Sequence, residues 1–206
     1  MDAAHLEETA HGLVPHDEGW FVLNARDSRW YERPGRGALC IFEGEPAFPQ
    51  LGVNLQVLGP GEPTSMYHWE ADQKDFLILS GEAVLVIEGA KRRLRAWDFV
   101  HCPVGANHVI VGAGTGPCAV LCVGARDRST GPDWGGYTAD PAAIRRGAGV
   151  EEDTTDPDTA YPRPPAGRAA TATAGCPILR PRTPRSRPGR ARGRASCRPT
   201  ACPPSA

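Results

Sequence analysis

The sequence predicts an all-β domain, a sandwich or barrel of short and mostly antiparallel strands. Helical periodicity is almost absent; instead, short runs of Val, Leu, Ile, Phe and Cys recur, each bounded by Gly, Pro, Asn or Asp. Runs of this kind are typical of β-strands joined by turns. They follow one another too closely for helical crossovers, so neighbouring strands are expected to pair antiparallel.

The expected strands include some that are apolar on both faces. F-L-I-L at 76–79 and A-V-L-V-I at 83–87 are of this kind, which indicates strands that are covered on both sides. The full set of expected strands covers residues 20–24, 38–43, 51–58, 66–70, 75–80, 82–88, 91–95, 98–102, 107–112 and 117–124.

One short helix is predicted after the strands. The segment D-P-A-A-I-R-R at 140–146 offers Asp140 as the N-cap and Pro141 at the first helical position, and Gly147 follows it. This is the usual start and stop signal of a helix. We expect the helix to pack over one open end of the barrel.

Charge divides the chain into two parts. Residues 166–206 hold nine arginines and no Asp, Glu or Lys, so the net charge of −1 for the whole chain leaves −10 on residues 1–165. Such an acidic body repels nucleic acids and anionic lipids. We therefore expect neither nucleic acid nor a membrane as a partner of the body.

The C-terminal part of the chain is predicted to be disordered. From Glu151 onward large apolar residues almost vanish, and such a segment cannot offset the entropy lost on ordering. The arginine-rich residues 166–206 have two interpretations: an arm that binds nucleic acid or a membrane surface, or the product of a frameshift in GC-rich DNA.

These observations predict four parts. Residues 1–19 are an N-terminal extension and residues 20–126 form the β-barrel. Residues 127–150 are a C-terminal extension with the short helix, and residues 151–206 are a disordered linker and Arg/Pro-rich tail.

The chain is expected to be cytoplasmic. No window holds the roughly 20 apolar residues of a membrane span, and the first 15 residues lack the pattern of a signal peptide. The seven cysteines form no C-x-x-C pair, and their odd number argues against a full disulfide framework. We expect the cysteines in the apolar runs to be buried thiols.

Two segments concentrate side chains that bind metals. In an extended strand, alternation places His68 and Glu70 on one face, about 7 Å apart along the chain. His108 begins another apolar strand after the turn P-V-G at 103–105. His101 has no partner at such a spacing and is expected to be a surface or packing residue.

The first of these segments resembles the first conserved motif of the cupin superfamily, which contains G, H-x-H, E and G at fixed spacings. Gly61 lies within one residue of the first glycine, and Gly81 matches the last. His68 matches the first histidine, Glu70 stands in place of the second, and Lys74 stands in place of the glutamate.

The second segment resembles the second motif of the same superfamily, which contains G, P-x-G, H and N. Pro103, Gly105 and His108 match the central residues, while Trp97 and Gly112 occupy the two ends. The resemblance covers about half of the chain. It implies a cupin-type double-stranded β-helix, or jelly-roll, barrel, and it implies a homodimer.

The resemblance also implies a metal site with three protein ligands, His68, Glu70 and His108. Two imidazoles and one carboxylate suit Fe(II) with open positions, or alternatively Mn(II) or Zn(II). The four-ligand site of three His and one Glu is excluded by Glu70 and Lys74.

Lys74 is the main departure, because an ammonium repels a divalent cation and must lose hydration when buried. It is expected to pair with Glu70 or Asp75, or to point outward. A pairing of Lys74 with Glu70 leaves open the alternative of a metal-free barrel, in which the two histidines are polar groups of a binding pocket. Lys74 and the aromatic Tyr67 are the candidate residues for binding a substrate.

The fold and the candidate site leave three alternatives for function. The first is a metal-dependent enzyme, a dioxygenase, isomerase or lyase, that acts on a small metabolite. The second is a small-molecule-binding or sensor protein without metal or catalysis; a decayed family member is a third alternative. Fold alone does not choose among them.

Overall fold

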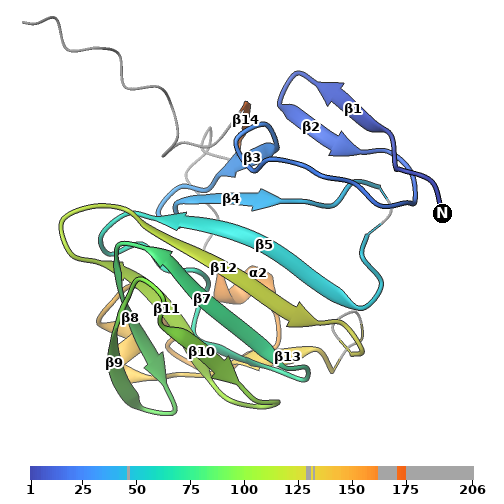
Figure 1. Ribbon diagram of the computed structural model, residues 1–206. Coiled ribbons are helices and arrows are strands. Elements are labelled where there is room, and N and C mark those ends of the chain that lie inside the picture. The colour runs from blue at the N-terminus through green and yellow to red at the C-terminus, as the bar shows by residue number, and fades with distance from the viewer. Residues whose placement is uncertain (46, 129–130, 132, 162–170, 175–206) are drawn as a thin grey trace, which may run out of the picture.

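The computed structural model describes residues 1–45, 47–128, 131, 133–161 and 171–174. Two antiparallel sheets face each other and enclose a barrel, and a separate hairpin lies beside them (Figure 1). The seven-stranded sheet has the order β10 (Phe99–Cys102), β7 (Lys74–Ser80), β12 (Cys118–Ala125), β5 (Leu51–Leu58), β4 (Ala38–Ile41), β3 (Arg29–Glu32) and β14 (Thr171–Ala174). The five-stranded sheet has the order β13 (Gly135–Tyr137), β6 (His68–Glu70), β11 (His108–Ala113), β8 (Glu82–Ile87) and β9 (Ala90–Arg95). The predicted all-β, double-stranded β-helix barrel is confirmed.

Alternation along the strands decides which side chains fill the barrel. On β12, Cys118, Val120 and Cys122 are buried, while the residues between them are only half-buried. The main core gathers such inward side chains from both sheets, and burial of each large one stabilises the fold by roughly 1.5–3 kcal/mol. The buried residues of this core are Leu58, Phe76, Ile78, Ala83, Leu85, Leu94, Val100, Cys102, Ile110, Cys118, Val120 and Cys122.

The four cysteines expected in apolar strands are all buried, namely Cys40, Cys102, Cys118 and Cys122. Burial raises the pKa of Cys102 and of Cys122 to about 12. These thiols therefore stay protonated and unreactive at neutral pH, as predicted.

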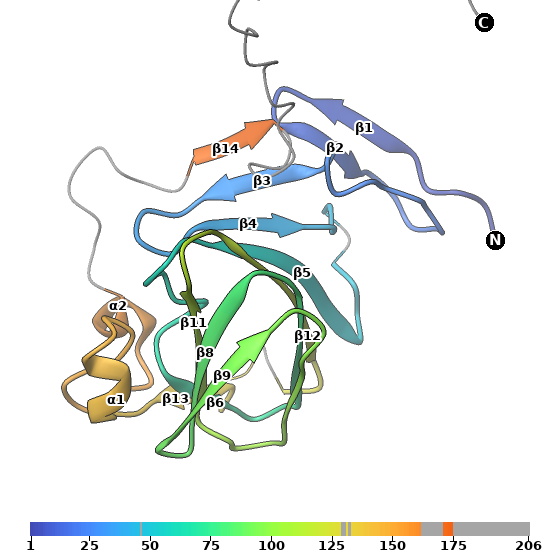
Figure 2. The same cartoon turned by 60° about the vertical axis from the view of Figure 1, so that its left-hand side comes forward.

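The predicted short helix is present, but it covers a different surface. Helix α1 (Pro141–Ile144) is capped by Asp140, whose side chain accepts from the amides of Ala142 and Ala143. The same two alanines are buried against the outward side chains of β8 and β11. The helix therefore covers the outer face of the five-stranded sheet (Figure 2), not an open end of the barrel.

The chain stays folded beyond residue 150, which corrects the expectation of a disordered linker from 151. Helix α2 (Pro157–Ala160) buries Ala160 in a cluster with Met66, Tyr137 and Val150. Strand β14 pairs with β3 at the edge of the large sheet. The rest of the predicted tail, residues 162–170 and 175–206, lies outside the described residues.

The N-terminal region also differs from expectation. Within the predicted extension, β1 (Leu6–Thr9) and β2 (Gly12–Pro15) form a hairpin. The strand expected at 20–24 is absent, apart from one bridge between Trp20 and Ala3. Strand β3 takes its place in the sheet, and its Trp30 is almost wholly buried. Neither of the two helices among the described residues has the length and apolar character needed to cross a membrane.

Candidate metal centre

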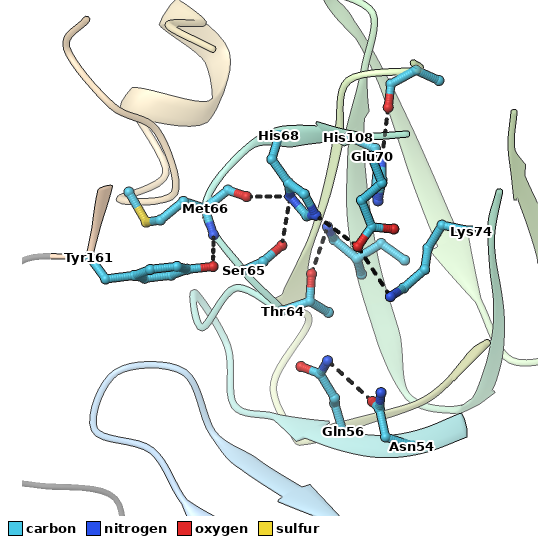
Figure 3. Close-up of polar contacts among 12 residues, drawn as sticks. Asn54, Gln56, Thr64, Ser65, Met66, His68, Glu70, Lys74, His108 and Tyr161 are labelled. Carbon is cyan, nitrogen blue, oxygen red and sulfur yellow. Dashed lines mark hydrogen bonds and ion pairs between the residues drawn. The ribbon is translucent and has the colours of Figure 1, made fainter. Parts of the chain in front are cut away.

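The three candidate ligands come from two neighbouring strands. His68 on β6 lies directly opposite His108 on β11. Glu70 is two residues further along β6, so alternation places it on the same face as His68. Figure 3 shows the two imidazoles and the carboxylate pointing toward one another inside the barrel. The structure thus brings together the three residues that the sequence singled out.

The ligand atoms of these residues are close enough to share one ion. One nitrogen or oxygen from each of His68, Glu70 and His108 lies within 4.8 Å of the other two. His68 Nε2 is 3.5 Å from Glu70 Oε1. Two atoms that bind one metal at 2.0–2.2 Å each are about 3–4 Å apart, so small side-chain adjustments suffice to close such a site.

The backbone fixes which nitrogen of each imidazole faces the centre. His68 Nδ1 lies 2.7 Å from the carbonyl oxygen of Met66, and His108 Nδ1 lies 2.9 Å from that of Ala106. A carbonyl oxygen only accepts, so each Nδ1 must carry the hydrogen and donate. In each ring this leaves Nε2 as the nitrogen that faces the centre, where the Glu70 carboxylate lies. Backbone carbonyls orient metal-binding histidines in the same way.

His108 Nε2 is a buried nitrogen whose hydrogen-bonding capacity is not satisfied by the described residues. It is buried and has no hydrogen-bond partner among the residues that the structure describes. Burial, together with the neighbouring His68, lowers the pKa of His108 to about 4, so the ring is neutral at pH 7. A buried acceptor without a donor is costly, by about 1–3 kcal/mol. A cation at this point would satisfy it, so the residues present fit a metal ion.

Glu70 is held in its charged form. Burial alone would raise its pKa, but the adjacent His68 and the charge of Lys74 outweigh burial and lower the pKa to about 2. Lys74 Nζ lies 3.4 Å from Glu70 Oε1, which is one of the two pairings expected for this lysine. Figure 3 shows Lys74 reaching the carboxylate from the side away from the imidazoles.

A cavity of about 240 Å³ opens beside the centre. His68, Glu70 and Lys74 line it, so the predicted substrate-binding Lys74 is at the site. The other residues that line the cavity are Gln56, Thr64, Ser65, Phe76, Trp134, Tyr137 and Tyr161.

The aromatic residues of the cavity were not predicted. Trp134, Tyr137 and Tyr161 come after the last strand of the barrel in sequence. The segments around β13 and α2 place their side chains at the cavity. The Tyr161 hydroxyl accepts a hydrogen bond from the backbone N–H of Met66. Burial, with Tyr161 nearby, raises the pKa of Tyr137, so this phenol stays protonated and able to donate. No motif in the sequence marks these positions.

Tyr67 is not part of the cavity, which corrects its prediction as a substrate-binding residue. Its side chain is buried with Val86, Val109 and Ala143 on the outer face of the small sheet. Since neighbouring residues of a strand point to opposite faces, the residue before His68 must turn away from the centre. His101, in contrast, is where it was expected: its side chain is half exposed and contacts Asp75.

Comparison with known proteins agrees with this architecture. Residues 54–124, about a third of the chain, match the family model described as a cupin domain. No curated protein matches the chain.

Several solved structures resemble the chain. A putative sugar phosphate isomerase from Acidithiobacillus ferrooxidans is 29% identical, with 37% of this chain and 51% of that one covered and a TM-score of 0.36. A cupin-superfamily sugar phosphate isomerase from Silicibacter pomeroyi is 28% identical, with 50% and 62% covered and a TM-score of 0.40. A predicted oxalate decarboxylase from Thermotoga maritima is 20% identical, with 51% and 98% covered and a TM-score of 0.45. The matched region thus spans between half and two thirds of the length of the two isomerases.

Proposed function

Because the chain belongs to the cupin superfamily through its domain at residues 54–124, we propose that it is a metal-dependent enzyme acting on a small metabolite. One divalent ion, Fe(II), Mn(II) or Zn(II), is bound by His68, Glu70 and His108. The observation that carries the proposal is the buried and unpartnered Nε2 of His108, which shares its space with two further metal-binding groups.

The ligand set supports a catalytic rather than a purely structural ion. Structural zinc sites have four protein ligands, whereas catalytic sites have three and leave one position open. When bound, an ion here supplies a Lewis acid or a redox centre. The reaction class is then that of a dioxygenase, an isomerase or a lyase.

The chain's own residues prepare the cavity for a polar substrate. The backbone carbonyls of Met66 and Ala106 keep both imidazoles in the tautomer that offers Nε2. Tyr137 and Lys74 line the cavity and bring hydrogen-bond donors to it. Trp134 and Phe76 add apolar walls that shield the centre from water, and shielding strengthens the polar contacts inside.

A second function is favoured by one contact. The ion pair of Lys74 with Glu70, at 3.4 Å, supports a binding or sensor protein without metal. In that case Lys74 neutralises the carboxylate in place of an ion.

Elemental analysis separates the two. We would purify the full chain without a histidine tag, together with His108→Ala and Glu70→Gln variants. His101→Ala is the matched control, because that imidazole lies on the surface. Near-stoichiometric metal in the wild type and the control, and its loss in both site variants, is the expected result. Absence of metal from the wild type after incubation with all three ions would leave the metal-free binding protein.

Homodimerisation stays a prediction of the family resemblance, and light scattering during size-exclusion chromatography tests it. The expected mass is twice the 22.0 kDa of the chain. Cytoplasmic location is likewise a prediction, tested by cell fractionation.

A further inference from the structure

A second cavity of about 170 Å³ adjoins the metal centre. It shares Glu70, Lys74 and Trp134 with the first cavity, so the two are neighbours across these side chains. Its remaining lining comes mainly from the large sheet and the segment that follows β12, namely Gly52, Asn54, Asp72, Gly124, Ala125 and Arg126.

Two glycines make room for two cations in this cavity. Gly52, Gly124 and Lys74 lie in one row across β5, β12 and β7, because Gly124 pairs with both of the others. A Cβ atom at Gly124 would lie 3.0 Å from Nζ of Lys74, and one at Gly52 would lie 3.0 Å from Nε and Nη2 of Arg126. The side chains of the lysine and the arginine thus occupy the space that side chains at the two glycine positions would fill.

Among the described residues, the guanidinium of Arg126 is anchored through one of its three nitrogens, Nη1. Its Nη1 donates to Glu43 Oε2 and to the carbonyl oxygen of Phe48, both at 2.8 Å. The Nε and Nη2 groups have no hydrogen-bond partner among the described residues. These two N–H groups form the edge of a guanidinium that binds carboxylate or phosphate through two parallel hydrogen bonds.

The carboxylates around the cavity already have hydrogen-bond or ion-pair partners. Asp72 Oδ2 accepts from the backbone N–H of Arg128 at 2.7 Å, and Glu43 holds Arg126. Glu70 faces the metal centre and Lys74. A divalent ion at His68, Glu70 and His108 would therefore leave the two cavities with an excess of positive charge, which favours an anionic ligand.

From this geometry we propose that Lys74 and Arg126 form an anion-binding subsite. It holds a carboxylate or phosphate group of the substrate, while the remainder of the molecule reaches past Glu70 to the metal centre. The inference rests on the proposed function, whose substrate class it narrows to small anionic metabolites.

Calorimetric titration tests the subsite. The probes are succinate and inorganic phosphate, with neutral succinamide as the matched control for succinate, and binding is measured on the zinc-loaded and on the chelator-treated protein. We expect succinate or phosphate, but not succinamide, to bind both forms, more tightly with zinc. Tighter binding of succinate would indicate a carboxylate site, and tighter binding of phosphate would indicate a phosphate site.

Variants show whether the two cations are responsible. Lys74→Gln and Arg126→Gln are each expected to weaken binding by on the order of ten-fold, whereas the exposed Lys91→Gln leaves it unchanged. Gly124→Ala keeps both charges but displaces Lys74, so it should also weaken binding. A thermal unfolding transition in each variant is the control for folding. If Arg126→Gln does not fold, Gly124→Ala still tests the subsite, because it leaves both charges in place.

The two proposals fail in different ways. A zinc-loaded protein that binds neither anion, or binds them equally well in the Lys74→Gln and Gly124→Ala variants, overturns the subsite and leaves the metal centre standing. A protein that takes up no metal, yet binds the anions through Lys74 and Arg126, overturns the metal-dependent enzyme and keeps the subsite.

Discussion

His68 and His108 face each other across two antiparallel strands, with their ring centroids 4.9 Å apart. Both Nδ1 atoms are engaged by backbone carbonyls. A proton added to His108 would therefore sit on the buried Nε2, next to the other imidazole. This arrangement makes the fold sensitive to acid.

The first prediction is a loss of stability below pH 6.5 in the metal-free protein. His108 has a pKa of about 4 in the folded state, against 6.5 for the ordinary group. Between these values the unfolded chain binds the proton and the folded one does not, so acid favours unfolding. The free energy of unfolding should fall by about 2 kcal/mol from pH 7 to pH 5.

Urea denaturation of chelator-treated protein at several pH values measures this change. Below pH 4.5, Glu70 adds to it in the same direction, because its pKa is lowered to about 2. A His108→Gln variant should lack the change between pH 7 and pH 5. An equal pH dependence in the variant would contradict the assignment.

The second prediction concerns Tyr67, which packs under α1 and away from the centre. Tyr67→Ala should lower the free energy of unfolding by about 3–5 kcal/mol, as for other large aromatic side chains removed from a core. Metal content should stay that of the wild type, provided the variant is measured below its unfolding temperature. Tyr67→Phe keeps the packing and is the control; loss of metal in Tyr67→Phe would place the hydroxyl at the site after all.

The third prediction concerns the N-cap of α1. Asp140 Oδ1 accepts from the amides of Ala142 and Ala143 at 2.7 and 2.8 Å. Asp140→Ala should cost about 1 kcal/mol of stability in chemical denaturation, whereas Asp140→Ser should retain most of it. Equal stability of the alanine and serine variants would mean that α1 does not depend on its cap.

The strands of the barrel could be predicted because each carries its own signal. Apolar alternation and bounding turn residues mark the strands between residues 38 and 124. Strand β3 was missed because only two aromatic residues, the buried Trp30 and Tyr31, stand between the charged residues of R-W-Y-E. Strand β13 was missed because G-G-Y has almost no side chains to form a pattern. Both depend on pairing with distant strands, which a local pattern does not contain.

The residues of the candidate site could be predicted where they lie in strands or turns with a local signal. His68 and Glu70 follow from strand alternation, and His108 from its place after the P-x-G turn. Alternation also carries the signal against Tyr67, because it puts that residue on the opposite face from His68. Trp134, Tyr161 and Arg126 reach the cavities from outside the two motifs, and only the folded chain brings them there.

The short length of β6 makes the local stability of this strand depend on whether metal is bound. This strand has three residues and meets β11 through the single pair His68 and His108. An ion held by both strands would add a second link at this single backbone pair, and ligand binding slows the local openings that expose amides to solvent. Amide hydrogen exchange in β6 should therefore slow when metal is added, while the interior of the large sheet, at β12, changes little.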